Sequence, residues 1–305
     1  MLKLRSFNGF ARAKWISSSV TTSRKWQGSG TKLVADTHAS SVSARPIEAV
    51  VEDIARAAGK LALTHFRSLA SLPVENKGHL DLVTEADKQV EEFLIASLRK
   101  SFPEDGIFGE EGGEIPGTTG RIWVIDPIDG TFNFVRGGQN WAVSIGLYEN
   151  RRPSFGVIHA PLRDLTLVGG KTIPSKLNGE PIKPLPALDM SRASTGFSFH
   201  PSVSTADRLE VIRFISDDLG ISFRFCGAAT ISLIEVMMGE TDGYVSLGDS
   251  TWDVMAALPI LGSLGVSHTI DWDRIELPQK LRFACGSEDF LRKVRPLLHR
   301  LSAAA

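Results

Sequence analysis

Apolar residues recur at helical spacing from residue 46 onward, on a face that includes Ile54 and Phe66. Such spacing predicts an amphipathic helix. A second run with the same period covers residues 90–98, and Asp87, just ahead of it, is expected to cap that helix. The folded part of the chain is therefore predicted to open with two helices.

Continuous apolar runs predict strands in the middle of the chain. Residues 122–125 indicate a buried strand that ends at Asp126-Pro127, because proline cannot continue a sheet ladder. Strand-like runs follow at 141–147 and 155–158, and the Asn178-Gly179 pair is typical of a hairpin turn. These elements predict a meander.

Helices and strands alternate in the remaining sequence. Strands are expected near 194–199 and 221–225, and helices over 206–219, 228–238 and 254–261. Mixed elements of this kind pack in layers, so the chain is predicted to have an α/β (α+β) fold. The folded domain is placed at residues 46–300, with two lobes of about 46–185 and 186–300.

The first 45 residues have a different composition. Basic residues and serines are frequent in this segment, and no acidic residue precedes Asp36. Transit peptides have this composition, and the alternatives are an ordinary disordered tail or an upstream extension that is never translated. Residues 1–45 are therefore expected to be a disordered leader, and a cytoplasmic and a mitochondrial location both stay open.

Charge and cysteine content exclude several classes of partner and site. Lys and Arg total 34 against 35 for Asp and Glu, so there is no net positive charge to hold nucleic acid or an anionic membrane. No apolar run approaches the roughly 18 residues that a membrane span requires. Cys226 and Cys285 lack the spacing of a zinc site or a disulfide framework. Neither a nucleic acid nor a membrane is expected as a partner.

The segment 123–134 carries the most informative chemistry. Its strand delivers Asp126 to the carboxyl end of a sheet, Asp129 follows three residues later, and the carbonyl of Ile128 lies between them. Three oxygen ligands of this kind suit magnesium better than zinc. The alternative is that the two aspartates only cap a turn, because Asp-Pro and Asp-Gly are frequent turn pairs.

Other residues strengthen the metal interpretation as a set. Glu110 lies in a glycine-bordered acidic loop, and Asp253 lies in the first turn of a predicted helix. Alone, each has an ordinary explanation, a solvated loop for Glu110 and charge compensation at a helix N-terminus for Asp253. A helix that begins at Gly130 and Thr131 would direct its N–H groups toward the same pocket, where a phosphate would bind.

Four segments resemble, in order and approximate spacing, the motifs of the inositol monophosphatase family. They are DLVTEAD (81–87), GEEGG (109–113), WVIDPIDGTFNF (123–134) and TWDVMAA (251–257). Four ordered motifs are far more specific than one glycine pattern. The resemblance implies a layered αβαβα sandwich, shared with fructose-1,6-bisphosphatase, and a homodimer.

The resemblance also implies a metal site. Glu110, Asp126 and the Ile128 carbonyl are expected to hold one Mg²⁺ ion, while Asp126, Asp129 and Asp253 hold a second. Paired metal ions lower the pKa of a bound water and stabilise the charge of a phosphoryl group.

Catalytic and substrate-binding roles follow from the same resemblance. Glu110 and Thr131 are expected to activate the water, with Asp87 supporting them or a third, weaker ion. Gly130 and Thr131 supply phosphate-binding N–H groups, and Asp129 is counted with the substrate-binding residues.

The function implied is Mg²⁺-dependent, lithium-sensitive hydrolysis of a small phosphorylated substrate, inositol monophosphate first. Histidinol phosphate is the alternative substrate. Because the metal motifs are common to phosphatases for several leaving groups, the sequence defines the reaction better than the substrate. A protein of another class, a regulatory or binding protein that keeps the fold without turnover, is the remaining alternative.

The side of the site that selects the substrate departs from the family pattern. Inositol-preferring members carry an acidic residue seven positions before the aspartate of the TWDVMAA segment, and this chain has Ser246 there. Inositol selectivity is therefore expected to be weak. Asp249 either substitutes for the missing acid or is a solvated loop residue. Phe225 and Cys226, ahead of a Gly-Ala-Ala sequence, predict a more apolar pocket wall.

Overall fold

The computed structural model describes residues 45–69, 74–78 and 81–303. The predicted leader, residues 1–45, lies outside this part except for Arg45. No helix among the described residues has the length and apolar content to cross a membrane.

Two long helices open the described chain, as predicted: α1 (Ile47–Phe66) and α2 (Glu85–Ser101). Thr84, not Asp87, is the N-cap of α2, so the predicted cap is wrong by one helical turn. Asp87 is the third residue of the helix, and its carboxylate accepts a hydrogen bond from the Thr84 N–H (2.8 Å). The Thr84 hydroxyl accepts in turn from the Asp87 N–H, so the two residues form a capping box. Asp87 therefore lies inside the helix and is buried.

The first sheet has the strand order β10-β9-β8-β7-β6-β5-β3-β4. Its pairs are antiparallel except for β3 with β5. The Asn178-Gly179 turn is confirmed, since it joins β9 to β10 with both residues at positive φ. A separate hairpin pairs β1 (Val74–Gly78) with β2 (Asp81–Thr84). The bounds are β3 (Gly106–Gly109), β4 (Gly113–Ile115), β5 (Ile122–Asp129), β6 (Ala142–Glu149), β7 (Arg152–Ala160), β8 (Leu165–Gly170), β9 (Lys176–Leu177) and β10 (Glu180–Pro181).

The second sheet has the order β12-β11-β13-β15-β14. Its strands are β11 (Ser194–Phe199), β12 (Ser222–Arg224), β13 (Gly243–Ser250), β14 (Ser267–His268) and β15 (Lys280–Gly286). The remaining helices are α3 (Thr131–Val135), α4 (Thr205–Arg213), α5 (Ala229–Met237), α6 (Thr251–Met255), α7 (Ala257–Ser263) and α8 (Glu288–Ala303). Short 3₁₀ turns span Pro161–Arg163 and Trp272–Arg274, and Phe214–Asp218 continues α4 as a π-helical turn.

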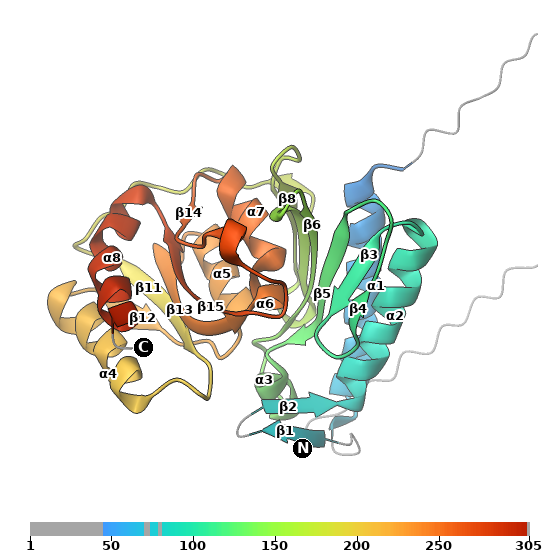
Figure 1. Ribbon diagram of the computed structural model, residues 1–305, viewed down its shortest axis with the longest axis horizontal. Coiled ribbons are helices and arrows are strands. Elements are labelled where there is room, and N and C mark those ends of the chain that lie inside the picture. Colours follow the sequence, from blue (N-terminus) through green and yellow to red (C-terminus); the bar gives the residue numbers. More distant parts are fainter. Residues whose placement is uncertain (1–44, 70–73, 79–80, 304–305) are drawn as a thin grey trace, which may run out of the picture. The chain divides into compact units, whose positions relative to one another are not determined.

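These elements form five layers (Figure 1). One apolar cluster joins α1 and α2 to the near face of the first sheet. A second cluster lies between the two sheets and is filled by α5, α6 and α7. A third joins the far face of the second sheet to α4 and α8. The predicted αβαβα sandwich is therefore confirmed.

The sequence predicted that strand β5 ends at Asp126-Pro127, and that prediction is wrong. The strand continues to Asp129, and its register against β6 shifts between Asp126 and Asp129. A bulge accommodates a proline because the residue there need not donate to the ladder. Both aspartates therefore stay on the end of one strand.

The middle helices lie directly on the backbone of the first sheet. A Cβ atom built on Gly156 of β7 would lie 2.1 Å from the Ala256 carbonyl oxygen, between α6 and α7. One built on Gly146 of β6 would lie 2.6 Å from the backbone of Met255. These two glycines allow α6, which carries Asp253, to approach β5 and β6.

We expect Gly156→Ala to lower the free energy of unfolding by about 1–3 kcal/mol, because the added methyl group overpacks a backbone contact. The matched control is Gly262→Ala in α7, where a Cβ atom meets no atom within 4 Å. That variant should be unchanged or slightly more stable, because alanine favours a helix over glycine. Urea denaturation measures both, and equal stabilities would contradict the close approach.

Candidate metal centre

Three carboxylates meet where the end of β5 faces the first turn of α6. Asp126 and Asp129 come from the end of β5, and Asp253 comes from the first turn of α6. One oxygen atom from each lies within 4.8 Å of the others. Asp126 and Asp129 are buried, and Asp253 is partly buried. The structure thus brings together residues that lie more than a hundred positions apart in sequence.

A backbone N–H group orients each carboxylate. Asp126 Oδ1 accepts from Ile128 N–H (3.1 Å), and Asp253 Oδ2 accepts from Ser250 N–H (2.6 Å). Asp129 Oδ2 accepts from Thr230 N–H (2.6 Å) in the first turn of α5. Each of these hydrogen bonds uses one oxygen of its carboxylate, so the second oxygen can face a cation. Asp253 is the third residue of α6, where it forms a capping box with the N-cap Ser250, and it belongs to the cluster at the same time.

Burial and mutual repulsion raise the pKa of these acids. Withdrawal from water is the largest cause for Asp126, followed by the nearby charges of Glu110, Asp129 and Asp253, and its pKa lies well above the usual range. The same causes raise the pKa of Asp253, and burial raises that of Asp129 to about 6. Buried like charges require a compensating cation, and carboxylate oxygens at this spacing suit Mg²⁺. The donor set therefore fits the predicted metal.

Glu110 lies at the tip of the β3–β4 hairpin and faces the same site. It lines a cavity of about 570 Å³ together with Asp129, Thr131 and Asp253. Its charge contributes to the raised pKa values of both Asp126 and Asp253. The structure thus places Glu110 beside the three aspartates, as the resemblance implied.

Glu91 of α2 holds this hairpin tip and was missed from the sequence. Its buried carboxylate accepts hydrogen bonds from the N–H groups of Glu111 (2.9 Å) and Gly112 (2.5 Å). A signal was available, because Glu91 falls on the helix face that carries Asp87, Leu94 and Leu98 at spacings of three and four residues. An acid on a buried helix face needs a partner.

Thr131 connects Asp87 to the cluster. Its hydroxyl lies 3.1 Å from Asp87 Oδ1 and 3.0 Å from the Ile128 carbonyl oxygen, and it donates to one of them at a time. Asp87 Oδ2 is occupied by Thr84, and burial raises the pKa of the Asp87 carboxyl. Gly130 has φ +93°, and a Cβ there would lie 2.5 Å from the Asn140 carbonyl oxygen, so only glycine allows α3 to begin at this point.

Asp249 is not the solvated loop acid that the sequence allowed. It is 7% exposed and lies in β13 at a bulge, where Gly248 has φ +107° and the register against β15 shifts. Its carboxylate accepts from Ser198 Oγ (2.5 Å) and the Tyr244 hydroxyl (2.7 Å). Ser246 is fully buried, and its Oγ accepts from the Asp249 N–H (3.1 Å). The bulge thus directs Asp249, and not Ser246, to the cavity beside the cluster.

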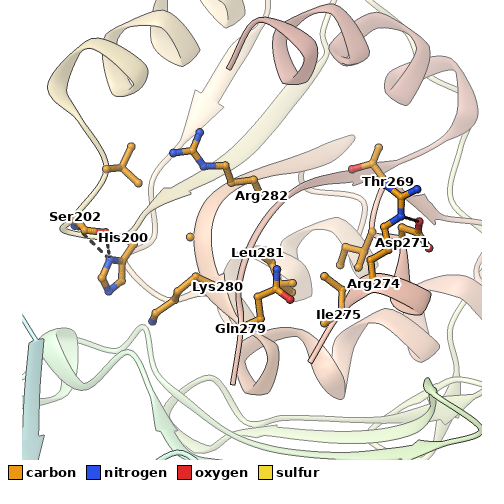
Figure 2. Close-up of a pocket in the computed structure, with 13 residues that line it drawn as sticks. His200, Ser202, Thr269, Asp271, Arg274, Ile275, Gln279, Lys280, Leu281 and Arg282 are labelled. Carbon is orange, nitrogen blue, oxygen red and sulfur yellow. Dashed lines mark hydrogen bonds and ion pairs between the residues drawn. The ribbon is translucent and has the colours of Figure 1, made fainter. Parts of the chain in front are cut away.

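Lys280 and His200 both line three adjoining cavities. These are the cavity of about 570 Å³ that Glu110 lines, the cavity that Asp249 lines, and a third of about 690 Å³. Lys280 Nζ donates to Ser250 Oγ (2.6 Å) and lies over the Trp252 ring. Figure 2 shows both side chains at one end of a cavity of about 690 Å³. Neither residue was assigned a role from the sequence.

Cys226 is buried, and its pKa is raised to about 11, chiefly by burial. A thiol in this state is protonated at neutral pH and is a poor nucleophile. The apolar wall predicted from Phe225 and Cys226 is present, since Phe225 lines the cavity beside Asp129 and Asp253.

The sequence matches the model of the inositol monophosphatase family over residues 43–297. It is 30% identical over 240 residues to a Xylella fastidiosa protein named Nus factor SuhB, across 77% of this chain and 85% of the relative. An Aquifex aeolicus protein named fructose-1,6-bisphosphatase/inositol-1-monophosphatase is 33% identical over 225 residues, across 72% and 84%. The solved Thermotoga maritima IMPase is similar with a TM-score of 0.71 and 26% identity, across 83% of this chain and 97% of that one.

We expect Asp126→Asn to raise the stability of the metal-free protein at pH 7.5 by about 1–3 kcal/mol, because it removes an uncompensated buried charge. A carboxyl whose pKa is raised by folding stabilises the protein below its unfolded pKa, and that contribution is lost as pH rises through the folded pKa. The gain from Asp126→Asn should therefore be smaller at pH 5. Thermal unfolding in EDTA at both pH values tests this, and a pH-independent difference would contradict it.

Proposed function

Because the chain belongs to the inositol monophosphatase family, we propose that it is a Mg²⁺-dependent hydrolase of small phosphate monoesters. The observation that carries the proposal is the buried carboxylate cluster of Asp126, Asp129 and Asp253, with Glu110 beside it. Inositol monophosphate is the first substrate to test, because two of the similar proteins carry that activity in their names.

The metal ligands proposed are the carboxylates of Glu110, Asp126, Asp129 and Asp253, with the main-chain carbonyl of Ile128. Bound Mg²⁺ lowers the pKa of a coordinated water and neutralises charge on the phosphoryl group and the departing alkoxide. The five ligands are oxygen atoms, and the backbone N–H groups that orient the aspartates keep them in position before any ion binds.

Thr131, Asp87 and Glu110 are the residues proposed to prepare the water. When the Thr131 hydroxyl donates to the buried Asp87 carboxylate, its oxygen lone pairs are left to accept a hydrogen bond from water. Glu110, which lines the same cavity as Thr131, then accepts the proton. The N–H groups at Gly130 and Thr131, at the start of α3, bind the phosphoryl oxygens, because the first N–H groups of a helix lack partners within it.

Histidinol phosphate is a second candidate substrate, and one observation favours it. The cavity beside the cluster combines apolar side chains with the Asp249 carboxylate, which could accept a hydrogen bond from an ammonium group or an imidazole N–H.

A homodimer and a cytoplasmic or mitochondrial location are also part of the proposal. A regulatory role without turnover is the alternative of another class, and one similar protein is named Nus factor SuhB. The presence of all four acids, three of them in one cluster and Glu110 in the adjoining cavity wall, argues against it.

Phosphate release should require Mg²⁺ and stop in EDTA, because the cluster without a cation repels the anionic substrate. Lithium ions should reduce the rate by competing at the weaker metal position. A malachite-green assay with inositol 1-phosphate and histidinol phosphate measures this after exhaustive metal removal. Full activity in EDTA would refute the metal mechanism.

Asp126→Asn should lower kcat by at least about a hundredfold, since an amide cannot supply the charge on which two metal ions depend and the loss is several kcal/mol. The matched control is Asp105→Asn, because Asp105 is also buried but bonds Trp123 Nε1 (3.0 Å), away from the cluster. That variant should keep wild-type kcat. More than about a tenth of wild-type activity in folded Asp126→Asn would remove this residue from the ligand set.

A further inference from the structure

Phenylalanines line a cavity that adjoins the acid cluster. This cavity has a volume of about 320 Å³, and its lining includes Asp129 and Asp253 together with Phe132, Phe199 and Phe225. Phe132 is 43% exposed and Phe225 is 59% exposed. Large apolar side chains left in water beside a reaction site mark a surface that binds a ligand.

The aromatic wall is held in a fixed arrangement. The Phe225 ring lies 5.6 Å from that of Phe197 and 6.4 Å from that of Phe199. The Arg136 guanidinium lies 5.7 Å from the centre of the Phe132 ring, a cation–π distance. These contacts restrain both exposed rings, so a ligand would order few side chains on binding.

Two polar groups of this cavity already form hydrogen bonds within the protein. Asp249 already accepts hydrogen bonds from Ser198 and Tyr244, and Lys280 donates to Ser250. A polyol needs a partner for each hydroxyl, and hydroxyls placed against aromatic rings lose their hydrogen bonds to water without replacement. A flat apolar group meets no such cost, and it covers phenylalanine surface that is otherwise exposed.

We propose that the leaving group of the substrate carries an aromatic ring, which packs on Phe225 and Phe132 while the phosphate lies at the acid cluster. This inference rests on the proposed phosphomonoesterase function and narrows its substrate class. Hydrolysis of such an ester breaks the P–O bond to the alcohol. Water supplies the hydroxyl to phosphorus and the proton to the alcohol, and the products are inorganic phosphate and an arylalkyl alcohol.

Steady-state kinetics with two esters of primary alcohols, 2-phenylethyl phosphate and glycerol 1-phosphate, tests the preference. The wild-type kcat/KM should favour the aromatic ester by about tenfold or more, since covering roughly 50 Å² of apolar surface is worth about that factor. Phe225→Ala should bring the two values close together, mainly by raising KM for the aromatic ester. Phe225→Tyr should keep the preference.

Phe223→Ala is the matched control. Phe223 is 42% exposed, its ring lies 5.3 Å from that of Phe197, and it does not line this cavity. It should keep the wild-type preference. The competing explanation is that Phe225 lies in an interface between copies of this chain, and light scattering on each variant tests it. Dissociation of an oligomer by Phe225→Ala alone would support that explanation and overturn the proposal.

Saturation-transfer NMR with the product alcohols reports on the ring subsite without turnover. In EDTA, 2-phenylethanol should bind the wild-type protein and Phe223→Ala but not Phe225→Ala, and glycerol should bind none of them. If no ester is hydrolysed but this pattern holds, the proposed function fails and the subsite stands. Hydrolysis of both esters without preference, or no Phe225-dependent binding, overturns the subsite.

Discussion

The acid cluster concentrates like charges at one buried point of the molecule. Three carboxylates with oxygen atoms within 4.8 Å repel one another, and burial adds to that cost by removing water. A protein can keep such a cluster only if its backbone holds the acids in place and a cation neutralises them. In this protein the first sheet and the middle helical layer together hold the three acids in place. Strand β5 fixes Asp126 and Asp129, and α6 brings Asp253 across from the middle layer.

The close contact between the middle helices and the first sheet follows from this constraint. Asp253 reaches the other acids because Gly146 and Gly156 lack the side chains that would otherwise separate α6 from β6, and the junction of α6 and α7 from β7. The bond from the Thr230 N–H to Asp129 joins α5 to the same point. The layered architecture therefore also positions the acids, because each of the three inner layers contributes a carboxylate of the cluster or an N–H group that orients one.

Features that depend on residues adjacent in sequence were predicted correctly. Predictions failed where the pairing between strands determines how far a strand continues or where a side chain points. Asp126 and Asp129 lie next to a strong strand signal, so their position at a strand end was predicted from local patterns. Asp253 was joined to them only as one of a set of acids and through the family resemblance. The continuation of β5 through Pro127 and the inward turn of Asp249 both result from bulges, which are set by the partner strands β6 and β15. Glu91 was missed for a different reason, because its partners are N–H groups some twenty residues away.

The same distinction explains why the reaction is easier to infer than the substrate. Chemistry at phosphorus needs oxygen ligands and N–H groups in fixed positions, and those come from contiguous segments with a recognisable order. The wall proposed to bind the leaving group is assembled from α3, from β11 and from the segment before α5, through Phe132, Phe199 and Phe225. Phe132 lies inside one of the recognised segments and Phe225 was expected at the pocket wall, but Phe199 lies in none of these segments. Substitution at such positions changes the surface offered to the leaving group and leaves the carboxylates and their N–H partners untouched, so one metal centre can serve chemically different alcohols.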